Sequence, residues 1–227
     1  IDLDSSGSVE IETTQLEAVD TTGSTVADLV LNLPAGDNAD VVLRNSTNAG
    51  EMELVGSTFA PTTFSVPAGS LTINGGSDAD AITIESLDSS FASDLIVNTG
   101  GGTDSVTISQ ALDFNGNLAI TAETITLNAS VDTTSGNQTY NGTLQQGTSG
   151  PMTLTAAEIY FNGDTTLQSG SSHEFQIRAN TATNTAGNLF NINGGRFKLV
   201  GGTELINDGQ METGTNRLFP IFATSES

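Results

Sequence analysis

Short runs of alternating apolar and polar residues recur along the whole chain, and glycine, asparagine or aspartate bounds each of them. Two typical runs are Leu71-Thr-Ile-Asn74 and Ser105-Val-Thr-Ile108. Alternation with a period of two predicts half-buried β-strands. The intervening Thr, Asn, Ser and Gly are unfavourable inside helices, because they compete for backbone hydrogen bonds or leave the backbone too free. The sequence therefore predicts an all-β protein made of many short strands.

The short strands belong to imperfect internal repeats. In the first repeat unit a strand ends in asparagine, a glycine-containing turn follows, and an aspartate opens the next strand. Three copies occupy residues 29–43, 71–84 and 95–108. The first copy has two extra residues in its turn, Leu33 and Pro34. A second, different repeat unit occurs at residues 118–128 and again at 152–162. Such repetition predicts a solenoid, in which each coil buries its inward side chains on the coils above and below.

We expect a β-solenoid, similar to a parallel β-helix, with glycine and asparagine at its corners. Asparagine suits a corner because it tolerates left-handed backbone angles and stacks in ladders. The alternative is one β-sandwich or two, since pairs such as Asn74-Gly75 and Asn162-Gly163 also suit hairpin turns. We expect residues 1–165 to form the repeat-containing solenoid. Residues 166–227 are expected to form a C-terminal β region that caps the solenoid or docks a neighbouring subunit.

The repeat segments resemble a known class of proteins. Segments such as Leu118–Asn128, together with Gly-Gly-x-Asp-x-Asp turns such as Gly75–Asp80, are similar to the repeat regions of very large secreted bacterial surface proteins, among them filamentous-haemagglutinin-like adhesins. The resemblance covers residues 26–165 and implies a β-solenoid that belongs to an adhesin. The copies are unequally spaced here, which departs from that family's regular rungs of about twenty residues.

Charge and composition exclude several classes of function. The chain has 27 Asp and Glu against 5 Lys and Arg, a formal net charge of −22. An acidic surface repels phosphate, so we expect no nucleic-acid partner. Without cysteine there is no disulfide, thiol nucleophile or thiolate metal site. No stretch approaches the ~20 apolar residues of a membrane-spanning helix, so we expect no membrane span.

We expect the protein to lie outside the cell or at the cell surface. The sequence begins at Ile1 without an initiator methionine or a signal sequence, which indicates a processed or excised chain. The absence of cysteine and the presence of a single lysine, Lys198, also fit an extracellular protein.

The turns rich in glycine and aspartate are candidates for calcium binding. Gly75-Gly-Ser-Asp-Ala-Asp80 is similar to the calcium-binding nonapeptide Gly-Gly-x-Gly-x-Asp, with an aspartate in place of the third glycine. Calcium prefers about six to eight oxygen ligands, and these turns are too widely spaced to stack as the nonapeptides do, so solvated turns are the favoured interpretation. Calcium is the alternative, and we expect no other cofactor. The candidate calcium ligands are Asp78, Asp80, Asp104 and Asp40.

Catalytic candidates are few, and we expect the protein not to be an enzyme. His173 is the only histidine, and Ser171 shares its face of an extended strand without a positioned acid. β-Helical enzymes that act on polysaccharides use aspartate clusters with basic or aromatic partners, which this chain largely lacks. Thr-x-Thr runs occur at Thr124–Thr126 and Thr153–Thr155. Arrays of threonine on one face can order water, as in ice-binding proteins, so this function is a minor alternative.

The C-terminal run Arg217-Leu-Phe-Pro-Ile-Phe222 is the most apolar part of the tail. Two interpretations are open. The run covers the last coil, which would otherwise pair edge to edge, or it docks onto a neighbouring subunit as an added strand. The residues predicted to dock are Leu218, Phe219, Ile221 and Phe222.

These observations predict a non-enzymatic, extracellular structural or adhesive protein. It would be a stiff β-rich segment of a bacterial surface adhesin or a building block of a cell-surface filament or layer. The expected partners are copies of the chain itself, or a glycan or protein of a host or cell surface. A calcium-stabilised binding module and a β-helical polysaccharide-active enzyme are the alternative functions.

Overall fold

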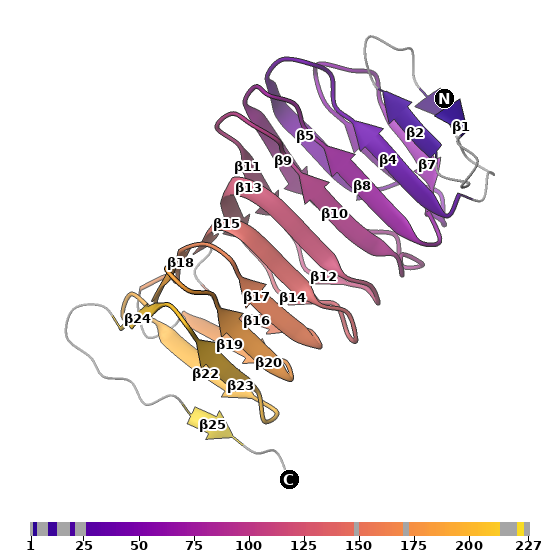
Figure 1. Ribbon diagram of the computed structural model, residues 1–227. Coiled ribbons are helices and arrows are strands. Elements are labelled where there is room, and N and C mark those ends of the chain that lie inside the picture. The colour runs from indigo at the N-terminus through magenta and orange to yellow at the C-terminus, as the bar shows by residue number, and fades with distance from the viewer. Residues whose placement is uncertain are drawn as a thin grey trace.

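The computed structural model describes the backbone of residues 2–3, 9–12, 19–20, 26–147, 150–169, 173–213 and 222–224, and the side chains of 26–147, 150–169 and 173–213. The described residues form strands and turns and contain no helix, so none of their segments is a helix that could span a membrane. The strands stack as successive coils along one axis (Figure 1). The predicted all-β solenoid is confirmed, and the β-sandwich alternative is wrong.

The coils pass through three parallel β-ladders, which we call face A, face B and face C. Face A stacks β2 (Val9–Glu12), β4 (Asp28–Asn32), β8 (Ser70–Asn74), β10 (Asp94–Asn98), the first halves of β13 (Leu118–Leu127) and β15 (Gln138–Gln146), β17 (Glu158–Phe161), β20 (Thr181–Asn184) and β23 (Glu204–Asn207). Face B stacks β5 (Asn38–Asn45), β9 (Asp80–Ile84), β11 (Ser105–Ile108), the second halves of β13 and β15, β18 (Thr165–Thr166), β21 (Leu189–Asn191) and β24 (Gln210–Glu212). Face C stacks β12 (Leu112–Asp113), β14 (Val131–Asp132), β16 (Met152–Thr155), β19 (Glu174–Arg178), β22 (Arg196–Val200) and β25 (Phe222–Thr224).

An antiparallel excursion interrupts the N-terminal coils. β6 (Glu51–Val55) pairs with β5 and with β7 (Thr62–Ser65), β3 (Val19–Asp20) pairs in parallel with β7, and β1 (Asp2–Leu3) pairs with β2. The excursion lengthens one coil. The length of this coil is seen from the hydrogen bond between Asn74 and Asn32, which lie at equivalent places on neighbouring coils but are 42 residues apart in sequence. Contacts between later coils span 24 residues (Asn98 to Asn74) or 20 (Asn137 to Asn117). The unequal spacing of the repeats therefore comes mainly from one inserted hairpin.

The first repeat unit is confirmed as one coil, since Leu71 pairs in register with Leu29 on one side and with Leu95 on the other. The second unit is not a coil repeat. Residues 118–128 pass from face A to face B, whereas 152–162 pass from face C to face A. The reason is that the pattern of two adjoining strands is the same at every corner and does not specify which corner it is.

The ladders continue across the predicted boundary between residues 165 and 166. β18 contains both residues, and it pairs with β15 on one side and with β21 on the other. The described part of the C-terminal region therefore adds coils to the same solenoid. Its predicted capping role stays a prediction.

The core consists of inward side chains stacked in columns. Leucines fill one column through four consecutive coils of face A, at positions 29, 71, 95 and 118. Aromatic rings pack in the core towards the C-terminus: Tyr140, which follows Ile120 in the neighbouring column, stacks on Phe161 with ring centroids 6.0 Å apart, and Phe161 meets Phe190 of face B edge-on at 5.3 Å. Each fully buried large apolar side chain contributes about 1.5–3 kcal/mol. No coil has this core alone, so the coils stabilise one another.

Candidate functional site

The corner between faces A and B gathers the aspartates of the repeat unit. Asp80 opens β9 and Asp104 directly precedes β11, and their side chains are 1% and 2% exposed. Asn38 opens β5 on the coil before Asp80, and Glu123 lies in β13 on the coil after Asp104. We call these four residues the acidic corner. Their alignment follows from the stacking, because the strand after each of these residues pairs in parallel with the corresponding strand of the next coil.

A one-directional hydrogen-bond ladder connects the acidic corner. The backbone N–H of Asn38 donates to Asp80 Oδ1 (3.2 Å), that of Asp80 donates to Asp104 Oδ1 (2.8 Å), and that of Asp104 donates to Glu123 Oε2 (2.9 Å). Each acidic side chain thus accepts the amide of the preceding coil. Hydrogen bonds of this kind, from an amide to a charged acceptor, are shorter and stronger than neutral ones.

Asp80 and Asp104 differ in how completely their oxygens are bonded. Asp80 Oδ1 also accepts from Asn38 Nδ2 (2.8 Å), and Asp80 Oδ2 accepts the N–H of Gly76 (2.8 Å). Asp104 Oδ2 has no hydrogen-bond partner, although it is buried. Among the described residues only Thr165 Oγ1 and Asn184 Oδ1 share this state.

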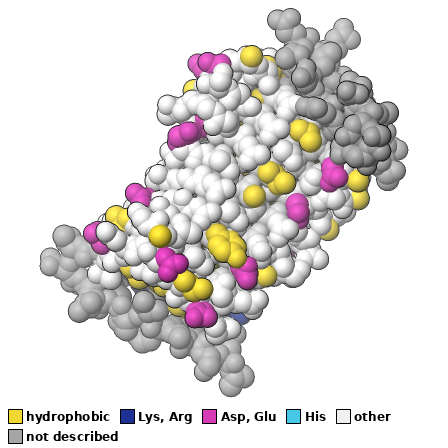
Figure 2. All heavy atoms as spheres, in the orientation of Figure 1, with side chains coloured by type: hydrophobic (Ala, Val, Ile, Leu, Met, Phe, Trp, Pro, Cys, Tyr) yellow, Lys and Arg dark blue, Asp and Glu magenta, His cyan; other side chains and the backbone are white. Residues whose placement is uncertain are grey.

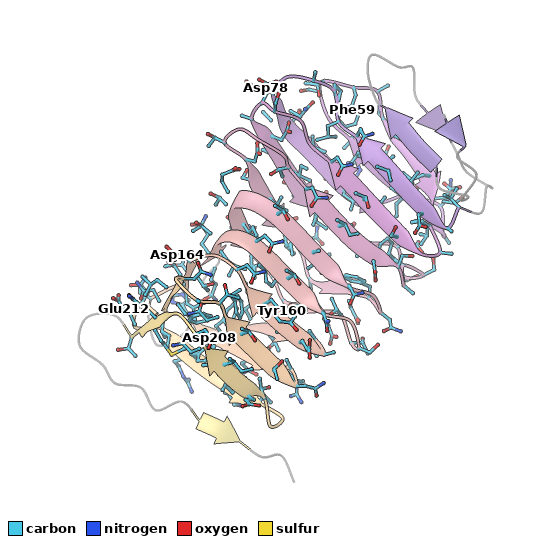
Figure 3. The ribbon with its side chains drawn as sticks, in the orientation of Figure 1. Phe59, Asp78, Tyr160, Asp164, Asp208 and Glu212 are labelled. Carbon is cyan, nitrogen blue, oxygen red and sulfur yellow. The ribbon has the colours of Figure 1, made fainter. Side chains whose placement is uncertain are left out.

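The other two predicted calcium ligands lie apart from the buried pair. Asp78 is exposed on the turn between β8 and β9, at the rim of the coils (Figure 3). Asp40 is exposed and accepts from the N–H (3.0 Å) and Oγ (2.9 Å) of Ser57; these hydrogen bonds, the backbone one first, lower the pKa of its carboxyl. A register shift in β5 separates Asp40 from the corner, so Asn38 takes the position opposite Asp80. No group of three or more His, Cys, Asp and Glu within the described residues is placed to hold a metal ion.

Sequence reasoning missed two members of the acidic corner. The sequence did not reveal Asn38, because aligning the repeat copies places Asp40, and not Asn38, opposite Asp80. The register shift in β5 that brings Asn38 there leaves no pattern in the sequence. The sequence did not reveal Glu123, because the six residues Thr99–Asp104 of one coil correspond to only two residues without glycine, Ala122-Glu123, in the next coil. The signal that could have found Glu123 is its position directly before the Thr124 strand run, where the earlier copies have aspartate.

A second set of side chains stacks on the outside of face A. Asn74 Nδ2 donates to Asn32 Oδ1 (2.9 Å) and Asn98 Nδ2 to Asn74 Oδ1 (3.4 Å). Further along, Asn141 Nδ2 donates to Thr121 Oγ1 (3.0 Å) and Asn162 Nδ2 to Asn141 Oδ1 (2.7 Å). We call these residues the asparagine ladder: Asn32, Asn74, Asn98, Thr121, Asn141 and Asn162. The expectation that asparagines at strand ends stack in ladders is confirmed.

The two Thr-x-Thr runs lie on different faces. Thr124 and Thr126 lie outward on face B, where Thr126 is in register with Thr107 and Thr107 with Thr83. Thr153 and Thr155 lie in β16 on face C instead. The runs therefore do not form one array, and water ordering stays a prediction.

The remaining predicted residues lie near the C-terminus. Phe222 opens β25, which pairs in parallel with β22 (Phe222 opposite Lys198), whereas Leu218, Phe219 and Ile221 lie outside the described residues. β25 therefore lies beside β22 of its own chain, and covering of the last coil stays a prediction. Docking onto another subunit stays a prediction.

His173 directly precedes β19, and its Nδ1 contacts the carbonyl of Ser169. Ser171 lies outside the described residues, so the geometry between these two side chains is not described.

In comparisons with known proteins, no family model, no curated protein and no solved structure matches the chain.

Proposed function

We propose that the chain is a stiff, non-enzymatic structural segment that acts outside the cell, in a bacterial surface adhesin or as a building block of a cell-surface filament or layer. The observation that supports this most is the continuity of stacking. Face A runs from β4 to β23 and face B from β5 to β24 through parallel pairs alone. The resemblance of the repeats to filamentous-haemagglutinin-like adhesins points the same way.

Stiffness follows from this arrangement. Backbone hydrogen bonds between coils run along the solenoid axis on faces A and B, and from β12 onward also on face C, so bending stretches the bonds of at least one ladder in the coils that have all three. The buried columns and the asparagine ladder lie along the same axis and add resistance to bending. A rod of this kind separates two points at a fixed distance, which is what an adhesin stalk or filament subunit requires.

The outer surface suits a protein that works in water among many neighbours. Acidic and hydrophobic side chains are dispersed over the face seen in Figure 2 and do not gather in one patch. A net charge of −22 keeps such rods soluble and limits unspecific association. The proposed partners are therefore copies of the chain at specific contacts, or a surface glycan or protein.

Electron micrographs of the purified native material test the proposal. Rods, filaments or layers are expected. Isolated compact particles, together with turnover of a polysaccharide that disappears when one aspartate is changed to asparagine, would contradict it and support the β-helical enzyme.

Deleting residues 218–222 tests the proposed contact between copies. Because Phe222 starts the strand that lies on β22, the deletion shortens that strand at its first residue. The truncated chain is expected to stay monomeric at concentrations where the intact chain forms filaments, as measured by light scattering. Polymerisation of the truncated chain would show that the contact lies elsewhere.

A further inference from the structure

Asp104 Oδ2 is a buried carboxylate oxygen without a hydrogen-bond partner. The side chain is 2% exposed, so bulk water does not compensate this oxygen. Native proteins seldom leave such an atom without a ligand, an ion or an ordered water, because an unpaired charged group is costly to bury. We propose that Asp104 Oδ2 anchors a calcium ion at the acidic corner, with backbone carbonyl oxygens and water, and not a cluster of carboxylates, as its other ligands.

The conformation of one turn explains why Asp104, and not Asp80, has the free oxygen. Asp80 Oδ2 accepts the N–H of the glycine four residues earlier, Gly76. The glycine at the equivalent place before Asp104 is Gly100, which has φ +92°, a left-handed conformation that Gly76 does not adopt. The turn before Asp104 therefore lacks the N–H donor that the turn before Asp80 provides through Gly76.

Backbone carbonyl oxygens of one coil pack against glycines of the neighbouring coil, close to the buried carboxylates. A Cβ atom added to Gly102 would lie 2.4 Å from the carbonyl oxygen of Asp78 and 3.2 Å from Asp104 Oδ1. A Cβ atom added to Gly75 would lie 2.2 Å from the carbonyl oxygen of Thr99 and 2.4 Å from Asp80 Oδ2. The missing side chains let carbonyl and carboxylate oxygens approach. Calcium takes this type of ligand, in irregular geometry and with water completing the shell.

The charges at the corner also favour a cation. Asp80, Asp104 and Glu123 lie on consecutive coils, and neighbouring parallel strands are about 4.8 Å apart. The ion pairs seen among the described residues join Arg44 to Glu53 and Arg196 to Glu174, and neither reaches this corner. A divalent ion would offset the repulsion between carboxylates and hold two coils together.

The test compares the thermal unfolding of the intact chain and of Asp104→Asn with and without calcium, followed by circular dichroism. The asparagine variant is expected to fold, because Asn38 fills the same corner two coils earlier and its Nδ2 donates to the carbonyls of Pro34 and Gly36. The matched control is Asp113→Asn, which removes an exposed carboxylate on face C. Calcium at about 10 mM, roughly tenfold above the dissociation constant of a weak extracellular site, is expected to raise the Tm of the intact chain and of the control by about 3–6 °C.

The proposal requires that Asp104→Asn lose most of this shift and that calorimetric titration show one calcium ion fewer per chain. Equal shifts in all three proteins would mean general screening of the acidic surface, and no shift in the intact chain would mean that water satisfies Asp104. Either result overturns the proposal.

Glu123→Gln is a second, milder variant, because the glutamine oxygen can still accept the Asp104 amide. It is expected to weaken calcium binding several-fold, and unchanged affinity in both variants would also refute the site. The site does not depend on the proposed structural role, so each can fail without the other.

Discussion

The acidic corner and the asparagine ladder repeat once per coil, and the same repeat unit builds both, yet they bond in opposite ways. An asparagine amide both donates and accepts, so each rung bonds to an identical neighbour, as Asn74 does with Asn32. A carboxylate only accepts, so it cannot bond to an identical neighbour; Asp80 and Asp104 each accept a backbone amide of the preceding coil instead.

The difference accords with burial: Asn38, Asp80 and Asp104 are buried, whereas Glu123 and the asparagine ladder are half-buried or exposed. The asparagine ladder is neutral and self-complementary, so it tolerates Thr121 at one rung and contact with water. The acidic corner accumulates like charge, which backbone amides compensate at both oxygens of Asp80 and at Asp104 Oδ1 but not at Asp104 Oδ2. The asparagine ladder therefore mainly sets register, whereas the acidic corner can respond to the surroundings.

Breaking the acidic corner at Asp80 is expected to have the largest effect. Asp80→Ala leaves the backbone amides of Asn38 and Gly76 without their acceptor at the corner, and Asn38 Nδ2 keeps only the carbonyls of Pro34 and Gly36. We expect a loss of about 3–5 kcal/mol in the free energy of unfolding, measured by urea denaturation. A loss below 1 kcal/mol would mean that water replaces the carboxylate.

The next largest effect is expected from a substitution that prevents the close approach of the coils at the same corner. Gly75→Ala would place a Cβ atom 2.2 Å from the Thr99 carbonyl oxygen, whereas Gly76→Ala meets nothing within 4 Å. The first variant is expected to lose about 3 kcal/mol and the second to stay near the stability of the intact chain. Similar stabilities for the two variants in urea denaturation would contradict the described stacking.

A third buried carboxylate, that of Asp88, allows the stabilising effect of such hydrogen bonds to be tested through the pH dependence of stability. Burial of Asp88 acts to raise the pKa of its carboxyl, but hydrogen bonds from Ser90 and Gly50 outweigh burial and lower it below the ordinary 3.8. Its stabilising contribution is therefore complete above the pKa of the unfolded chain and is lost as the pH falls through the lower pKa of the folded protein.

Asp88→Asn is accordingly expected to cost about 1–2 kcal/mol at pH 7 and to reduce the loss of stability on acidification below pH 4. Urea denaturation of both proteins from pH 7 to pH 3 measures the difference. Parallel pH profiles would show that the hydrogen bonds do not favour the ionised form.

The smallest effect is expected in the asparagine ladder. Asn74→Ala removes one hydrogen bond on each side of a half-exposed rung, and water replaces both, so the expected loss is about 1 kcal/mol. A loss as large as that of Asp80→Ala in the same denaturation experiment would remove the distinction between the two ladders.

Much of the fold could be predicted because it repeats. The alternation in Leu71-Thr-Ile-Asn74 specified a strand with one buried side, and its recurrence at Leu95 specified a neighbour in register. The second repeat unit did not predict a coil repeat correctly, because two adjoining strands have the same sequence pattern at every corner of the solenoid. The candidate site was half predicted: Asp80 and Asp104 were named, but Asp40 was named where Asn38 belongs.

By itself the sequence determined the strands, the asparagine ladder and the two buried aspartates, because alternation and turn residues act over a few neighbouring positions. Tertiary structure decided which residues meet across coils. The register shift in β5 put Asn38 opposite Asp80, and the left-handed Gly100 left Asp104 Oδ2 without a donor. Such contacts depend on the backbone path of two coils at once, and no single stretch of sequence encodes that path.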